Sequence, residues 1–230
     1  SDRLDYLCGL AATVGVPTGS SDPYALRRAA IGLLAVHRGT PMLADLSLAD
    51  GLRLAASGQP VDVAEPVIDA ITGFLARRLE TMLTEEGVPA DWARAAMVHS
   101  ARPSRVDRVL TDLAALIGTP ECRRLVETMV RIQRIVPSGT AAEIRAEALS
   151  EPAEVRLRQA LARTRALNTT EADLASFVRD TAELTEAVNA FFADVLVMSD
   201  DPQLRAARLG LLASVAQLGA PVLAWEQLHL

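Results

Sequence analysis

The sequence predicts an all-α protein built from helical bundles. Half of its 230 residues are apolar but only 3% are aromatic, so the core must consist mainly of alanine and aliphatic side chains, which suit closely packed helices. Apolar residues recur at the three- and four-residue spacing of helices, and no segment alternates with the period of two expected of a strand. Breaks that contain Gly and Pro separate the helical segments.

The first half of the chain contains predicted helices with recognisable starts. Asp22 and Pro23 supply an N-cap and a first-turn proline for the second of these helices. Asp62 and Glu65 have the spacing of a capping box and open the longest helix, which ends near Gly87. The predicted helices cover approximately residues 4–14, 23–38, 62–86, 92–99 and 103–117.

The second half of the chain shows the same pattern. Thr119 and Pro120 begin a helix that reaches Val136, and Pro137 and Gly139 end it. Further helices are expected to begin at Thr140, Glu151, Thr170 and Asp201, with a break near Thr181.

Charge is distributed unevenly along the chain. The formal net charge is −6, and all 23 basic residues are arginines. Residues 1–100 hold 8 arginines and 12 acidic residues, residues 101–170 hold 12 and 8, and residues 171–230 hold 3 and 9. The basic middle segment fits either a phosphate-binding surface or a solvated arginine face. The change of sign near residue 100 favours a boundary there, which gives domains at 1–100 and 101–230.

Cysteine and histidine residues form no recognisable motif. Cys8 and Cys122 are far apart and lie outside any C-x-x-C pair, which predicts two reduced thiols of the core. His37, His99 and His229 lack the spacing of metal ligands on a helix. The phosphate-binding and nucleophile motifs rich in glycine are also missing from the sequence. We therefore expect no metal site, no bound cofactor and no catalytic residue in this chain.

Hydropathy argues against a membrane protein. No apolar run reaches the ~18 residues that a membrane-spanning helix needs, because Arg, Asp or Glu interrupts each one. A soluble, cytoplasmic protein without a membrane partner is expected. The chain begins at Ser1 without a basic and apolar leader, which is typical of a piece of a longer chain.

The most specific pattern lies near the end of the chain. Residues 188–201 read V-N-A-F-F-A-D-V-L-V-M-S-D-D, and residues 204–212 read L-R-A-A-R-L-G-L-L. This order resembles the end of the β subunit of bacterial glycyl-tRNA synthetase, which has V-x-x-F-F-D-x-V-M-V-M, an acidic turn and R-x-N-R-L-x-L-L.

Other stretches resemble the same family. Residues 2–5 (D-R-L-D) and 17–30 (P-T-G-S-S-D-P-Y-A-L-R-R-A-A) are similar to the subunit's A-D-K-L-D and P-T-G-S-K-D-P-F-A-L-R-R-A-A runs. Residues 74–91 follow a weaker family pattern of a long helix, a Glu-Gly turn and Ala-Asp. The resemblance thus extends over nearly the whole chain.

The resemblance implies that the chain is the last third or so of a β subunit. Residues 1–100 would be the end of an HD-like helical domain with connecting helices, and residues 101–230 a helical anticodon-binding domain of the DALR kind. The α subunit, or a fused α region, would catalyse glycylation with ATP and Mg, and this chain would bind tRNA-Gly. The implied partners are tRNA-Gly and the α subunit, and not DNA.

Arginines are the candidate tRNA-binding residues, because a guanidinium can stack on unpaired anticodon bases or neutralise phosphates. Two pairs at i, i+3 spacing fall in motifs shared with the family. The candidates are Arg131, Arg134, Arg205 and Arg208.

The aromatic pair in the most specific motif is expected to have another role. Phe191 and Phe192 have Val188, Val195 and Met198 as apolar neighbours in the sequence, which predicts that the two rings pack in the core rather than stack on a base.

The sequence departs from the family at polar positions. The family pattern K-R-x-x-N-I appears as V-R-I-Q-R-I at residues 130–135, and Ala207 occupies the place of Asn in R-x-N-R. Two alternatives therefore stay open. One is a diverged relative that acts as a helical protein-interaction module. The other is a remnant of an HD phosphohydrolase, in which Asp2 would be the last ligand of a metal site whose histidine partners the chain lacks.

Overall fold

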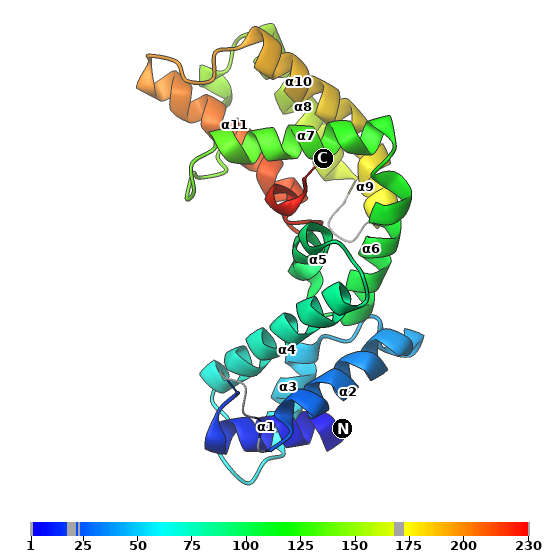
Figure 1. Ribbon diagram of the computed structural model, residues 1–230. Helices are drawn as coiled ribbons and strands as arrows, with labels where there is room; N and C mark the ends of the chain where they lie inside the picture. Colours follow the sequence, from blue (N-terminus) through cyan, green and yellow to red (C-terminus); the bar gives the residue numbers. More distant parts are fainter. Residues whose placement is uncertain (1, 18–21, 23, 168–172, 230) are drawn as a thin grey trace. The chain divides into compact units, whose positions relative to one another are not determined.

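The structure is a computed structural model that describes residues 2–17, 22, 24–167 and 173–229 (Figure 1). Every regular element among these residues is a helix, which confirms the all-α prediction. None of the described helices is both long enough and apolar enough to cross a lipid bilayer. The predicted motif positions 18–21 and Pro23, and the predicted cap at Thr170, lie outside the described residues.

The chain divides into two compact units, residues 1–110 and 111–230, which are described separately. The division falls after Leu110, inside the helix Pro103–Leu116. The charge pattern had favoured a boundary ten residues earlier, after residue 100. The two domain limits inferred from sequence stay a prediction.

Unit 1 is a bundle around the long helix α4. Its α-helices are α1 (Asp2–Val14), α2 (Leu26–Gly39), α3 (Leu48–Ser57), α4 (Glu65–Glu85), α5 (Ala90–Ala96) and the first part of α6 (Pro103–Leu116), with short 3₁₀ helices η1 (Pro41–Leu43) and η2 (Met97–His99). Helices α1, α2 and α3 all pack on α4. Ile71, Leu75 and Leu79 recur every fourth residue on α4 and are buried, and each contributes about 1.5–3 kcal/mol through burial of its side chain.

Helix α3 lies where the sequence predicted none. Its buried Leu48 and Leu52 have helical spacing, but Gly51 interrupts the pattern of helix-forming residues. In the fold, Gly51 lies close to Leu4 of α1, and a β-carbon at Gly51 would come within 3.2 Å of a Leu4 methyl carbon. The close approach of α1 and α3 therefore explains a glycine that sequence propensity counts against the helix.

Two predicted helix starts in unit 1 have different outcomes. The predicted N-cap at Asp22 is wrong in position, because α2 begins at Leu26 with Ala25 as its N-cap, but the Asp22 carboxylate still accepts hydrogen bonds from the N–H groups of Leu26 at 2.8 Å and Arg27 at 3.0 Å. The predicted capping box at Asp62 is wrong. Helix α4 begins at Glu65 with Ala64 as its N-cap, and no side chain caps it.

Both cysteines are free and buried, as predicted for thiols of the core. Cys8 lies on α1 in unit 1, and Cys122 lies in the first turn of α7 in unit 2. Burial is the main cause that raises the pKa of each thiol, so both stay protonated and weakly nucleophilic at neutral pH.

Unit 2 is a second bundle, which carries the candidate site. It contains the rest of α6, then α7 (Pro120–Ile135), α8 (Pro152–Ala166), α9 (Leu174–Asp180), α10 (Ala182–Asp194) and α11 (Pro202–Gly219), with short 3₁₀ helices η3 (Ala146–Ala148) and η5 (Trp225–Gln227). Helix α10 packs on α8 and α7, and α11 packs on α7 and α8 (Figure 1). The predicted break near Thr181 is confirmed, because this residue separates α9 from α10.

The caps of unit 2 largely follow the sequence. The Thr119 hydroxyl accepts from the N–H of Cys122 at 3.3 Å, and Asp201 accepts from the N–H of Gln203 at 2.8 Å. Glu151 begins α8 as predicted, and its side chain takes part in a capping box with Glu154. These local interactions fix where α7, α8 and α11 begin.

The helix predicted from Thr140 is wrong. Residues 136–149 contain only η3 as regular structure. The backbone of this segment packs tightly on Gly210 of α11, where an added β-carbon would overlap the carbonyl oxygen of Glu143. A tertiary contact of the backbone with α11 has overridden the local helix signal.

Replacement of Gly210 with alanine is expected to destabilise unit 2 by about 1–3 kcal/mol, because the new methyl group must displace a backbone carbonyl. The measurement is urea denaturation followed by circular dichroism. Gly39→Ala is the matched control, since a β-carbon at Gly39 meets no atom within 4 Å. Equal stability of the two variants would contradict the tight packing at Gly210.

Candidate nucleic-acid interface

Helix α7 presents arginines on its exposed side. Its buried stripe includes Leu125 and Ile132, while Arg123, Arg131 and Arg134 are exposed. Arg123 and Arg134 point to the same side, because 11 residues complete about three helical turns. Within the part of the chain that the structure describes, none of these three arginines forms an ion pair. Their charges are therefore available to an anionic ligand.

Three other arginines of the basic middle segment are already paired. Carboxylates on the surface of unit 2 neutralise them, whereas Arg156 and Arg165 of α8 are exposed and, like the three α7 arginines, form no ion pair among the described residues. The surface ion pairs join Arg124 to Glu186, Arg145 to Glu143, and Arg163 to Glu183.

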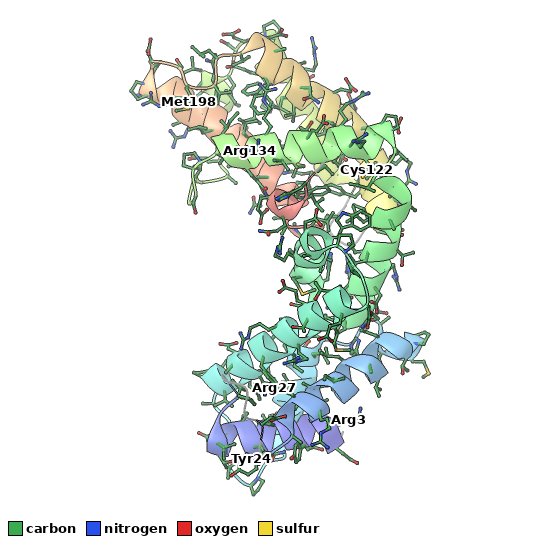
Figure 2. The ribbon with its side chains drawn as sticks, in the orientation of Figure 1. Arg3, Tyr24, Arg27, Cys122, Arg134 and Met198 are labelled. Carbon is green, nitrogen blue, oxygen red and sulfur yellow. The ribbon has the colours of Figure 1, made fainter. Side chains whose placement is uncertain are left out.

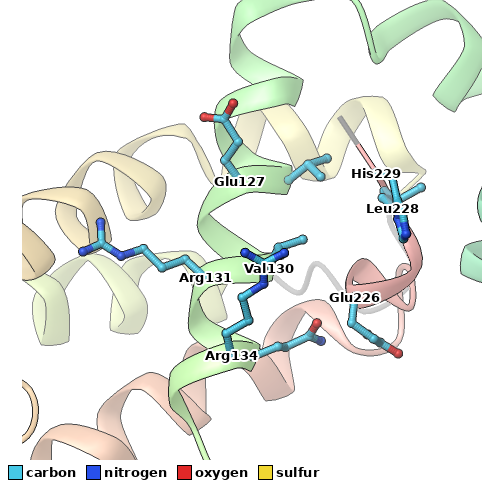
Figure 3. A pocket seen from close by; sticks show the side chains of 9 residues that line it. Glu127, Val130, Arg131, Arg134, Glu226, Leu228 and His229 are labelled. Atoms are coloured by element: carbon cyan, nitrogen blue, oxygen red, sulfur yellow. The ribbon is translucent and has the colours of Figure 1, made fainter.

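A groove of about 660 Å³ borders α7, and we name it the α7 groove. One wall is α7 and the other is the C-terminal segment around η5, as Figure 3 shows. The lining residues are Val126, Glu127, Val130, Arg131, Gln133, Arg134, Glu226, Leu228 and His229. Arg134 lies toward the end of α7 (Figure 2), so this candidate residue borders a cavity large enough for a small ligand.

Arg131 has an aromatic partner on α10. Its guanidinium carbon lies 4.1 Å from the centre of the Phe192 ring, a cation–π contact. Phe192 in turn meets Phe191 edge to face, with ring centres 6.0 Å apart. Phe191 is fully buried, which confirms its predicted place in the core. Phe192 is half-buried and supports Arg131, whereas Met198, expected among its apolar surroundings, is 56% exposed.

The second predicted arginine pair holds the turn between α10 and α11. Arg205 donates from Nη1 to the carbonyl oxygen of Ser199 at 3.0 Å. Arg208 donates from Nη1 to the carbonyl oxygen of Leu196 at 2.7 Å. Leu196 and Met198 are exposed on this turn, so the two arginines fix the backbone while these apolar side chains face solvent.

The prediction that Arg208 binds tRNA is not supported by its position in the fold. Its Nε donates to Glu154 at 2.7 Å and its Nη2 to Glu151 at 3.1 Å. Arg208 is only 4% exposed and Glu154 is completely buried. The guanidinium therefore links α11 to the start of α8 inside the bundle and has no exposed face to offer to RNA. Ala207 is buried as well, so a polar residue at this position would not reach an RNA on the surface.

The structure thus separates the two pairs of candidates. Arg131 and Arg134 lie on the exposed side of α7, and Arg205 and Arg208 belong to the packing of α11. The C-terminal wall of the α7 groove, with Glu226 and Leu228, did not emerge from the sequence. The sequence offers one indication of this wall, which is Trp225. A tryptophan in a short final segment is expected to be buried against the rest of the protein.

Metal chemistry finds no support in the described residues. Asp2, the candidate last ligand of an HD-type site, is exposed in the first turn of α1. Among the residues that the structure describes, no group of three or more His, Cys, Asp or Glu side chains is arranged to hold a metal ion.

Two family models match the chain in separate regions. Residues 1–98 match the model of the glycyl-tRNA synthetase beta subunit, and residues 125–223 match the DALR anticodon binding domain. The second match includes α7 from Leu125 onward and the whole of α11.

Curated relatives cover nearly the full chain. The glycine–tRNA ligase beta subunits of Ralstonia nicotianae and Leptothrix cholodnii are both 34% identical to it, over 225 and 223 residues and 94% of the chain. That of Desulfatibacillum aliphaticivorans is 33% identical over 95% of the chain. The matched region is 32%, 31% and 33% of these relatives, so the chain spans about a third of their length.

Proposed function

Because the chain belongs to the family of glycyl-tRNA synthetase β subunits, we propose that it is a tRNA-binding region that supports glycylation of tRNA-Gly in the cytoplasm. The proposal assigns anticodon binding to unit 2 and glycine activation, with its ATP and Mg, to an α subunit or a fused α region. No residue of this chain is given a catalytic role.

The observation that carries the proposal is the exposed side of α7. Arg123, Arg131 and Arg134 lie there without ion-pair partners among the described residues, inside or beside the region that matches a DALR anticodon binding domain. Unpaired arginines bind phosphates and stack on splayed bases. The chain has a net charge of −6, so binding is expected to depend on a local cluster of arginines such as this one.

Replacement of Arg134 with alanine is expected to weaken binding of a tRNA-Gly transcript severalfold at moderate salt. It should also lower the slope of log affinity against log salt concentration by roughly 0.7, the value for one lost phosphate contact on a single strand. Fluorescence anisotropy titrations at several salt concentrations measure both quantities.

Arg163→Ala is the matched control, since Arg163 is also an exposed arginine of unit 2 but is paired with Glu183. It should leave the affinity nearly unchanged. Equal affinity for tRNA-Gly and for a transcript with an altered anticodon would remove the assignment of anticodon recognition. Binding that does not respond to salt would remove the α7 arginines as the binding surface.

A further inference from the structure

The charges of the α7 groove suit a neutral polar ring better than a phosphate. Glu127 and Glu226 line the groove together with Arg131 and Arg134, so a phosphate placed inside would meet two carboxylates as well as two guanidinium groups. Figure 3 shows Arg131 extending from α7 on the side opposite to Glu226, where it contacts Phe192. Arg134 is therefore the cation nearer to the C-terminal wall, where Glu226 lines the groove without forming an ion pair among the described residues.

The remaining lining of the groove suits an aromatic ring. Val130 of α7 supplies partly exposed apolar surface, and the largely buried Val126 and Leu228 contribute the edges of their side chains. Glu226 is exposed, and no hydrogen bond or ion pair occupies its carboxylate among the described residues. The groove thus combines a small apolar surface, on which a planar ring can lie, with polar groups that can bind the edge of the ring.

We propose that the α7 groove receives one unpaired nucleobase of the bound tRNA, an inference that rests on the proposed function. The ring contacts Val130 and Leu228, and Arg134 binds the adjoining phosphate. Glu226 accepts a hydrogen bond from an amino group on the edge of the base. Cytosine, adenine and guanine carry such a group, whereas uracil has a carbonyl oxygen in the place of the cytosine amino group, and in the same pose that oxygen would face the carboxylate and be repelled. Glu226 is therefore a specificity-determining residue that selects against uracil at one position.

The test uses the full chain and a fluorescent hairpin with the anticodon arm of tRNA-Gly. A set of hairpins replaces each loop base that carries an amino group with uracil in turn. Anisotropy titrations are expected to show one position at which uracil weakens binding about tenfold. The variant Glu226→Gln should reduce that loss to less than about threefold, because a carboxamide can also donate to a carbonyl oxygen.

The matched control is Glu121→Gln, which removes an exposed carboxylate that lies on α7 but outside the groove lining. It should keep the tenfold loss. Glu226 is exposed, so an unchanged circular dichroism melting curve is expected for the Gln variant. If Glu226→Gln discriminates as the parent chain does, the base-binding role of the groove is overturned while tRNA binding stands. If the parent chain binds none of the hairpins, the proposed function fails and this inference fails with it.

Discussion

Replacement of Arg208 with alanine is expected to destabilise unit 2 by about 3–5 kcal/mol, the usual cost of removing one partner of a buried ion pair. Glu154 is completely buried, and without Arg208 its carboxylate would lose the Nε donor at 2.7 Å. The backbone at Leu196 would lose its donor too. Urea denaturation measures the loss, with Trp225 fluorescence in a Trp92→Phe background as the signal of unit 2.

Two companion variants separate the ion pair from general effects of truncation. Arg205→Ala removes a single hydrogen bond, to the carbonyl oxygen of Ser199, and should cost about 1 kcal/mol. The double variant Arg208→Met with Glu154→Leu removes both charges and should recover much of the stability. A cost near 1 kcal/mol for Arg208→Ala, together with weaker tRNA binding, would restore Arg208 as an RNA contact.

The helices of this protein could be predicted where their signals are local. The caps at Thr119 and Asp201 accept the backbone hydrogen bonds that their sequence positions indicate. Prediction failed where tertiary contacts decide. Helix α3 forms despite Gly51, because the small residue allows the close contact between α3 and α1. The helix signal at Thr140 is overridden by the packing of residues 141–143 on Gly210.

The candidate site could be predicted only in part, for a physical reason. The pairs Arg131–Arg134 and Arg205–Arg208 have the same spacing, and nothing local shows which pair faces solvent. The buried hydrogen-bond partner of Arg208 is Glu154, which is 54 residues away in the sequence. A contact over such a separation depends on how α8 and α11 pack, so an inward-facing arginine looks like an RNA-binding one until the fold is known.

The C-terminal wall of the groove depends on one aromatic anchor. Trp225 is fully buried, stacks near Phe177 with ring centres 5.9 Å apart, and donates from Nε1 to the carbonyl oxygen of Gly219 at 2.8 Å. It directly precedes Glu226, so the position of the carboxylate in the groove follows from the burial of the indole. The stability of unit 2 and the discrimination between bases are therefore coupled through this residue.

Replacement of Trp225 with alanine is expected to destabilise unit 2 by about 3–5 kcal/mol, because it leaves a large cavity beside Phe177. Uracil discrimination in the hairpin assay should also be lost, since the segment that carries Glu226 loses its anchor. Urea denaturation followed by circular dichroism measures the first effect. The second is measured below the unfolding transition, where the variant remains folded.

Trp225→Phe is the conservative control, because it keeps an aromatic ring at this position. It keeps an aromatic ring near Phe177 but removes the donor to Gly219 and part of the ring volume, so it should cost about 1–3 kcal/mol and keep most of the discrimination. If Trp225→Ala stays folded and still rejects uracil about tenfold, the C-terminal segment does not form a wall of the base site. If Trp225→Phe instead loses discrimination as completely as Trp225→Ala, an aromatic ring beside Phe177 is not sufficient to position Glu226, and the complete indole with its hydrogen bond to Gly219 is required.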